Sequence, residues 1–197
     1  GRTISTQQEE GLKAYGLLLN AKIKRHEGVT LTEAEQAVVN KLGISIMSGQ
    51  GTGKDAFLSW VILHFHFCLY NSTVLCTAPA GPQLKVVLWA EIYKWLRQSK
   101  LHDDIVHQSD IIFHKDHGRK KWFVVPRTIK DSADPAAQAE TLAGLHEDYL
   151  MYGIDEGSGV QDPVFGPIEG SMTGFCNFAI IIFNPTRSTG YAIETQG

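Results

Sequence analysis

Short apolar blocks recur along the chain, and a glycine, a proline or an acidic residue lies at or close to the end of each. Blocks of this length, bounded in this way, are typical of buried β-strands. Because the blocks are continuous rather than alternating, both faces of their strands are predicted to be covered, as in a parallel sheet. Four such strands are expected, within residues 44–47, 72–79, 149–156 and 178–185.

Longer stretches between these blocks predict helices. Residues 31–43 carry a capping box, with Thr32 as the N-cap and Glu35 as its partner, and Gly43 is expected to end this helix. Residues 56–70 are apolar nearly all round, which indicates a helix packed against a sheet. Further helices are predicted within residues 1–29, 83–97 and 163–170.

One segment departs from this alternation of strands and helices. Residues 110–114 and 120–126 are both rich in strand-forming residues, and Gly118 lies between them, so a β-hairpin is expected. The whole pattern predicts an α/β fold in which a mainly parallel central sheet is flanked by helices, with one antiparallel hairpin excursion. We expect an N-terminal helical segment, residues 1–30, followed by one α/β domain, residues 31–197.

The composition narrows the class of protein only a little. The 197 residues are 43% hydrophobic and carry a formal net charge of −3, so no overall basic field indicates a nucleic-acid partner. The three cysteines lie far apart in the sequence, which argues against a disulfide framework or a zinc site. The most apolar run, residues 56–70, is interrupted by polar side chains and is too short to span a bilayer, so no membrane association is expected.

The motif SGQGTGKD, residues 48–55, predicts a phosphate-binding loop. It joins a predicted strand to a predicted helix, so the backbone N–H groups of a glycine-rich turn and the positive end of the helix dipole converge on a phosphate. Lys54 is placed to reach the β- and γ-phosphates. The strict pattern has a glycine in place of Ser48 and a Ser or Thr in place of Asp55. The expected nucleotide-binding residues are Ser48, Gly49, Gln50, Gly51, Thr52, Gly53, Lys54 and Asp55.

Two adjacent carboxylates, Asp155 and Glu156, follow the predicted strand at residues 149–154. Asp155 can hold the water shell of Mg²⁺, and Glu156 can orient and polarise an attacking water molecule. The ends of neighbouring parallel strands face one crevice. Together with the phosphate-binding loop, these acids indicate a nucleoside triphosphatase that carries its own catalytic glutamate.

The last predicted strand also ends in polar residues, namely Asn184, Thr186 and Arg187. Asn184 can sense the γ-phosphate or position water, and Arg187 can report the nucleotide state to a neighbouring element. The other interpretation is that Asn184 and Pro185 simply end the strand. The residues alone leave both interpretations open.

Four motifs, in this order, resemble the ATPase domain of the large terminase subunits of tailed bacteriophages, the motors that pump DNA into an empty capsid. They are SGQGTGKD, CTAPAGPQLKVVLWAEIYK, AETLAGLHEDYLMYGIDEGSGVQDPVF and FNPTRSTG. The resemblance runs from about Thr32 to Gly190. It implies a P-loop NTPase fold of the ASCE type, the class that keeps a catalytic glutamate.

The resemblance also implies roles for single residues, with ATP and Mg²⁺ as the ligands. Lys54 and the loop glycines match Walker A, Asp155 matches the Walker B acid, and Glu156 matches the catalytic carboxylate. Residues 184–187 fall at the motif that couples hydrolysis to DNA movement. Gln36 resembles the glutamine that contacts adenine, although the aromatic residue that often precedes it is absent.

Asp55 leaves two interpretations open. A carboxylate is a good ligand for Mg²⁺, so Asp55 can replace the usual hydroxyl while adding negative charge beside the triphosphate. Alternatively, Asp55 points away from the nucleotide and stabilises the start of its helix through the helix dipole.

The source of a catalytic arginine is also open. Such motors need an arginine to neutralise the charge that develops on the transferred phosphate. Arg127, which follows residues 120–126, and Arg187 are the candidates, acting within the chain or across a subunit interface. A surface salt bridge is the alternative role for each.

The sequence thus predicts the ATP hydrolase of a double-stranded-DNA packaging motor. The resemblance implies as partners double-stranded DNA, the procapsid portal, the small terminase subunit and further copies in a ring, in the cytoplasm of an infected bacterial host. The family's nuclease domain has no counterpart in residues 1–197, so we expect no DNA cleavage by this chain. The alternatives are a helicase-like DNA-remodelling ATPase and a nucleotide-binding scaffold in which Asp55 has ended hydrolysis.

Overall fold

The computed structural model describes residues 3–49, 51–108, 110–128, 145–160, 162–185 and 191. Within these residues, seven strands form one sheet in the order β1-β7-β6-β2-β5-β4-β3. The strands β1, β7, β6, β2 and β5 run parallel to one another, whereas β4 pairs antiparallel with β5, and β3 pairs antiparallel with β4. The strands are β1 (Gly43–Met47), β2 (Thr73–Thr77), β3 (Ile105–His107), β4 (Ile112–His114), β5 (Phe123–Pro126), β6 (Tyr149–Ile154) and β7 (Cys176–Phe183).

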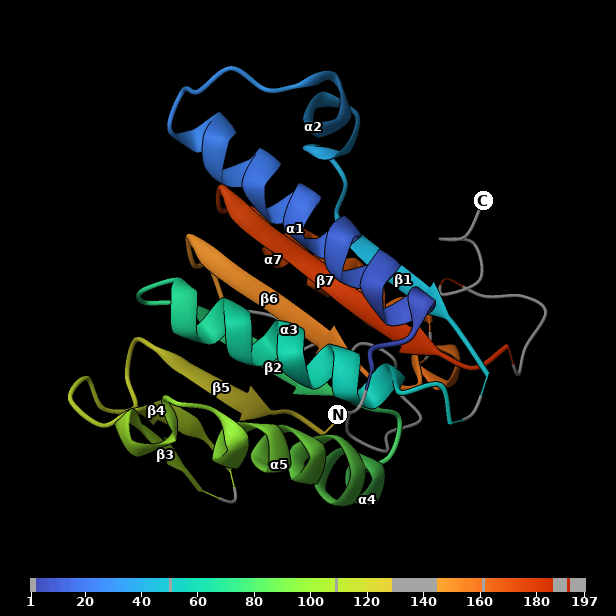
Figure 1. Cartoon of the computed structure of the whole chain (residues 1–197), viewed down its shortest axis with the longest axis vertical. Coiled ribbons are helices and arrows are strands. Elements are labelled where there is room, and N and C mark those ends of the chain that lie inside the picture. The colour runs from blue at the N-terminus through green and yellow to red at the C-terminus, as the bar shows by residue number, and fades with distance from the viewer. Residues whose placement is uncertain are drawn as a thin grey trace.

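Helices cover both faces of the sheet, as the apolar strand sequences predicted. In Figure 1, α1, α3 and α5 lie on the face toward the viewer, and α7 lies behind the sheet. The helices are α1 (Thr6–His26), α2 (Glu33–Val38), α3 (Lys54–Cys68), α4 (Gly81–Gln83), α5 (Ala90–Gln98) and α7 (Phe165–Ser171). The predicted α/β class with a mainly parallel sheet is therefore confirmed.

Strand β7 shows why an unbroken apolar sequence is needed in this fold. All eight of its residues are buried. Successive side chains of a strand point to opposite faces, so Ile180 and Ile182 enter the core under α1 and α3. Ala179 and Ile181 enter the core under α7. A strand with one polar face would leave one of these two cores incomplete.

The glycine expected to end the second helix has another role. Thr32 and Glu35 do form the predicted capping box, but α2 ends at Val38 and Gly43 is the first residue of β1. A Cβ atom at Gly43 would lie 2.4 Å from the carbonyl oxygen of Ala179 in β7. Gly43 therefore permits the close pairing of two strands, and its assignment as a helix stop was wrong.

The antiparallel excursion is larger than predicted. The hairpin that joins β4 and β5 turns at Gly118, which has a left-handed φ of 67° that glycine adopts without strain. β3 pairs with β4 at the far side of the sheet and was not expected. Its three residues are too few to show a periodic pattern in the sequence.

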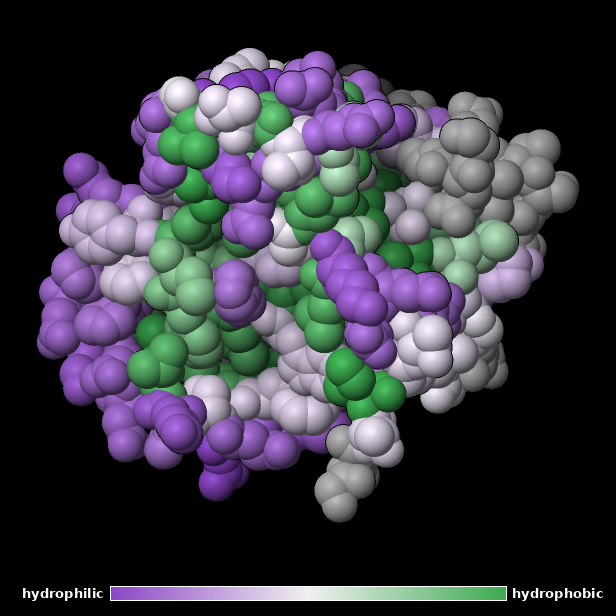
Figure 2. Space-filling model, turned by 45° about the horizontal axis from the view of Figure 1, so that its top comes forward, coloured by the Kyte–Doolittle hydropathy of each residue, from purple (hydrophilic) through white to green (hydrophobic). Residues whose placement is uncertain are grey.

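The surface that Figure 2 shows is uneven in polarity. Hydrophobic side chains occupy a hollow left of its centre, and hydrophilic side chains line the outer rim on that side. Among the described residues, no helix has the combination of length and apolar character that a membrane span requires. The apolar helix α3 is instead buried in the core through most of its length.

Candidate active site

The predicted site lies at the C-terminal ends of three neighbouring parallel strands. β1, β7 and β6 are adjacent, and their registers align Met47 with Phe183 and Ile154 with Ile181. The residues that follow these strands are therefore close in space, although they are far apart in the sequence. The phosphate-binding loop follows β1, Asn184 follows β7, and Asp155 follows β6.

The loop that follows β1 curls as a phosphate-binding loop must. Gly51 and Gly53 have left-handed φ angles of 72° and 82°, and Gly53 is the N-cap of α3. The Thr52 hydroxyl donates to the Gly49 carbonyl at 3.1 Å and also meets the Ser48 hydroxyl. Ser48, which replaces a glycine of the strict pattern, thus has a bonding role inside the loop.

The first turn of α1 holds both ends of this loop. The Gln7 amide donates to the Met47 carbonyl at 3.1 Å and accepts from the Ser48 hydroxyl at 2.9 Å. The Gln8 amide donates to the Gly53 carbonyl at 2.9 Å. These two glutamines were missed in the sequence, where the only local signal is the capping box that Gln8 forms with Ser5.

Lys54, Asn184 and Glu156 form one polar network at the mouth of the loop. The Lys54 ammonium donates to Oδ1 of Asn184 at 3.1 Å and lies 3.5 Å from Oε1 of Glu156. The Asn184 amide donates to the same glutamate oxygen at 2.9 Å. The Lys54 side chain is only 9% exposed. The positive charge of the loop is therefore balanced by the predicted catalytic carboxylate, and Asn184 holds both.

The backbone at Glu156 is unusual. Its φ and ψ of 49° and 46° are left-handed, which is uncommon for a residue with a long side chain. Such conformations persist where the surrounding structure enforces them, and they concentrate at functional sites. Here the sharp turn directs the glutamate toward Lys54 and Asn184 immediately after the strand ends.

Asp155 is almost completely buried, with 1% of its surface exposed. Its Oδ2 accepts a hydrogen bond from the Gln83 amide at 3.3 Å, whereas its buried Oδ1 has no hydrogen-bond partner among the described residues. Burial, aided by the charges of Asp55 and Glu156, raises the pKa of Asp155 to about 6. An unpartnered buried carboxylate oxygen of this kind fits a divalent cation.

Asp55 lies in the first turn of α3, directly after Lys54. Burial raises the pKa of its carboxyl group above the ordinary value, Lys54 opposes this shift, and Glu156 adds to it. The charge of Asp55 in turn contributes to the raised pKa of Asp155. The described residues contain no ready-made cluster of three metal-binding side chains. Mg²⁺ is commonly held by one or two carboxylates together with phosphate oxygens and water, so such a cluster is not required for it.

The other predicted site residues lie apart or outside the described residues. Arg127 follows β5, two strands from β6 on the same sheet edge, and its side chain is exposed. Gln36 lies on α2, before the opposite end of β1, and its amide donates to the Leu31 carbonyl at 3.4 Å. The structure does not bring Gln36 to the loop. Three predicted residues lie outside the described ranges, namely Gln50, Thr186 and Arg187.

The paired histidines of α3 have structural partners. Nδ1 of His64 meets the Tyr15 hydroxyl at 2.9 Å. His66 is completely buried, and its ring packs against Trp122 at 5.4 Å between centroids. Both rings therefore contact side chains within the fold, His64 through a hydrogen bond and His66 through ring packing.

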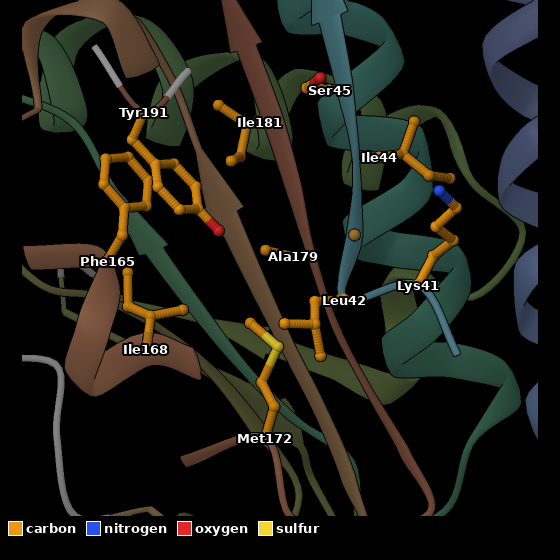
Figure 3. A pocket seen from close by; sticks show the side chains of 11 residues that line it. Lys41, Leu42, Ile44, Ser45, Phe165, Ile168, Met172, Ala179, Ile181 and Tyr191 are labelled. Carbon is orange, nitrogen blue, oxygen red and sulfur yellow. The ribbon is translucent and has the colours of Figure 1, made fainter. Parts of the chain in front are cut away.

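A separate cavity of about 270 Å³ lies on the α7 side of the sheet. Figure 3 shows Phe165 and Ile168 of α7 facing Ile181 of β7 across it, with Tyr191 beside Phe165. The rings of Phe165 and Tyr191 are stacked, with their centroids 4.1 Å apart. Among the described residues, none of those predicted for the nucleotide site lines this cavity.

Comparison with known proteins supports the motif-based resemblance. No known protein-family profile matches the chain. A protein of Enterobacteria phage P7, described as a probable terminase, large subunit, is 29% identical over 162 residues. The match covers 77% of this chain and 31% of that protein, so the chain spans about a third of the length of this relative.

Solved structures show the same fold. The large terminase of a thermophilic bacteriophage superposes with a TM-score of 0.61 at 12% identity, over 93% of this chain and 40% of that chain. The large terminase ATPase domain of Thermus phage P74-26 gives a TM-score of 0.57 at 16% identity, over 98% and 74%. The first of these large terminases, in complex with ADP, gives 0.54 at 12% identity, over 92% and 38%. In fold and in sequence, the chain is similar to the ATPase domain of the phage terminase large subunit, which confirms the resemblance that its motifs indicated.

Proposed function

We propose that this chain hydrolyses ATP with Mg²⁺ as the motor domain of a phage DNA-packaging machine. The observation that carries the proposal is the network of Lys54, Asn184 and Glu156 at the mouth of the glycine loop. The similarity to large terminases, one of which was solved with ADP, supports the same site.

The nucleotide phosphates bind where the loop amides and the start of α3 converge. Both the backbone N–H groups and the helix dipole favour an anion there. The Lys54 ammonium lies 3.5 Å from Oε1 of Glu156. A triphosphate would compete with Glu156 for this ammonium, which would leave the Glu156 carboxylate available to an attacking water.

The buried Asp155 and the half-buried Asp55 are the residues that would hold the metal. Oδ1 of Asp155 is available to it, and Asp55 is near enough for its charge to raise the pKa of Asp155. Mg²⁺ would supply positive charge to neutralise the charge that develops on the phosphates. Glu156 orients and activates water, and Asn184 keeps the Glu156 carboxylate in place through its amide.

The remaining expectations extend the proposal to the assembled motor. Asn184, Thr186 and Arg187 couple hydrolysis to movement of double-stranded DNA, and Arg127 or Arg187 supplies the arginine that stabilises the transition state. The partners are further copies in a ring, the procapsid portal and the small terminase subunit, in the cytoplasm of the infected host.

ATP turnover measured with Mg²⁺ over a range of protein concentrations tests this proposal, with Glu156→Gln as the control. We expect turnover that disappears in Glu156→Gln while nucleotide binding remains. Specific activity that rises with protein concentration would show that a neighbouring copy completes the site. Nucleotide binding without any turnover under these conditions would overturn the proposal in favour of a non-hydrolysing scaffold.

A further inference from the structure

Gln83 contacts the predicted metal-binding carboxylate from a different part of the chain. It ends α4, the short helical turn after β2, and its amide nitrogen lies 3.3 Å from Oδ2 of Asp155. A carboxylate can only accept in such a contact, so the Gln83 amide donates. Gln83 lies within the motif CTAPAGPQLKVVLWAEIYK, but no role was assigned to it from the sequence.

The helix that carries Gln83 is firmly anchored. After α4 it continues as a π-helical turn, Leu84–Trp89, and then as α5. Leu84 and Leu88 are completely buried, and the Trp89 indole donates to the Gln108 carbonyl at 3.1 Å. π-helical turns inside α-helices are rare and frequently occur at functional sites. The packed turn leaves Gln83 little freedom to leave Asp155.

The loop that follows β2 also packs tightly on the loop that follows β6. A Cβ atom at Gly159 would lie 2.6 Å from Cγ of Pro79, four residues before Gln83. The two loops that carry Gln83 and Asp155 are therefore in close contact, which limits how far the two residues can separate. A site built on such contacts holds its geometry better than one on free loops.

The hydrogen bond from Gln83 leaves the two carboxylate oxygens of Asp155 in different surroundings. Oδ2 is held by Gln83, while Oδ1 is buried and has no hydrogen-bond partner among the described residues. A carboxylate anchored through one oxygen presents the other in a fixed direction. Partners that orient a metal ligand in this way typically change metal affinity by about 10- to 100-fold when they are removed.

We propose that Gln83 is a positioning residue that orients Asp155 for the divalent cation accompanying the nucleotide, an inference that rests on the proposed ATPase function. Gln83 touches neither the nucleotide nor the reacting atoms. Its loss weakens the binding of the metal–nucleotide complex and leaves the binding of metal-free nucleotide unchanged.

Calorimetric titration with a non-hydrolysable ATP analogue tests this inference on the whole chain, once with Mg²⁺ and once with EDTA. The variants are Gln83→Met, which keeps the side-chain length but cannot donate, and Gln98→Met, the same change at the exposed end of α5. We expect Gln83→Met to lower the affinity gained from Mg²⁺ by about tenfold, with affinity in EDTA within twofold of the wild type. Gln98→Met should match the wild type in both titrations.

The outcomes separate this inference from the proposed function. If Gln83→Met keeps the full gain from Mg²⁺, Gln83 does not position the metal ligand. If it loses affinity equally in Mg²⁺ and EDTA, its role is general folding of the site and the inference also fails. If the wild type binds no nucleotide, the proposed function itself fails.

Discussion

Lys54 and Asn184 are 130 positions apart in the sequence and are joined by a hydrogen bond of 3.1 Å. The contact links the end of the glycine loop to the end of β7, and Asn184 extends it to Glu156 at 2.9 Å. The proposed phosphate-binding lysine and the proposed water-activating glutamate are therefore both held by the Asn184 amide. We expect a change in nucleotide state to reach Glu156 through this amide as well as through Lys54.

Replacement of Asn184 tests this link. In Asn184→Ala, Glu156 loses its amide donor, and we expect kcat for ATP to fall by about 10- to 100-fold, because general-base catalysis depends on a positioned carboxylate. Nucleotide affinity in EDTA should change by less than about threefold, since the loop and Lys54 remain. Single-turnover kinetics and equilibrium binding measure the two effects, and an unchanged kcat would contradict the role of Asn184.

Replacement of Asp55 separates the two interpretations of this residue. Asp55→Thr removes a negative charge beside the phosphates, so we expect metal-free nucleotide to bind more tightly. If Asp55 is a metal ligand, the variant also requires more Mg²⁺ for half-maximal turnover. Titrations of nucleotide in EDTA and of Mg²⁺ in the turnover assay measure the two effects. An unchanged Mg²⁺ requirement would show that Asp55 serves its helix and not the metal.

The glutamines of α1 can be tested separately from the fold of the helix. Gln8→Met removes the donor to the Gly53 carbonyl, and the loss of one such bond, worth about 1 kcal/mol, should weaken nucleotide binding roughly fivefold. Ser5→Ala removes a cap of the same helix without touching the loop and serves as the control. Equal weakening in both variants would mean that only helix stability matters.

Because His66 is buried, we expect the folded protein to lose stability in acid. Burial, aided by the positive charge of His114, lowers the pKa of His66 from 6.5 to about 4. The folded state favours the neutral form of His66. Its contribution to the free energy of unfolding is therefore complete above pH 6.5 and is lost as the pH falls from 6.5 through 4. The maximal contribution is roughly 3 kcal/mol.

Thermal unfolding of His66→Gln between pH 4 and pH 7 measures this contribution. Tm should fall less steeply with acid in the variant than in the wild type. His117→Gln, an exposed position in the neighbouring hairpin, serves as the control and should retain the wild-type slope. Parallel curves for all three proteins would show that His66 does not contribute.

Alanine substitutions at Gly43 and Gly166 test whether the close approach of β1 to β7 requires a glycine. Gly43→Ala places a methyl group against the Ala179 carbonyl, where the strands cannot separate without loss of their pairing. We expect a destabilisation of about 1–3 kcal/mol. Gly166→Ala in α7 meets no atom within 4 Å and should be neutral or stabilising. Denaturant unfolding of both variants compares them, and equal stabilities would contradict the close-approach role of Gly43.

Several features were accessible from the sequence because they depend on neighbouring residues. The continuous apolar strands, the capping box at Thr32 and Glu35, and the turn at Gly118 follow from periodicity and local turn chemistry. The placement of the loop, the acids and Asn184 at strand ends followed from the same pattern. The mainly parallel character of the sheet was inferred from general rules of α/β folds, and the observed strand pairing agrees with it, whereas the order of the strands was not predicted.

Other features depend on how distant elements pack, and no local pattern reports this. Gly43 resembled a helix stop because only the paired β7 carbonyl reveals why a side chain is excluded there. Gln7, Gln8 and Gln83 are ordinary polar residues of helices until α1 and α4 are brought against the ends of β1 and β6. The sequence by itself thus determined which chemical groups stand at the strand ends. The tertiary structure alone decided which amides orient them, because those contacts arise from the packing of helices on the sheet.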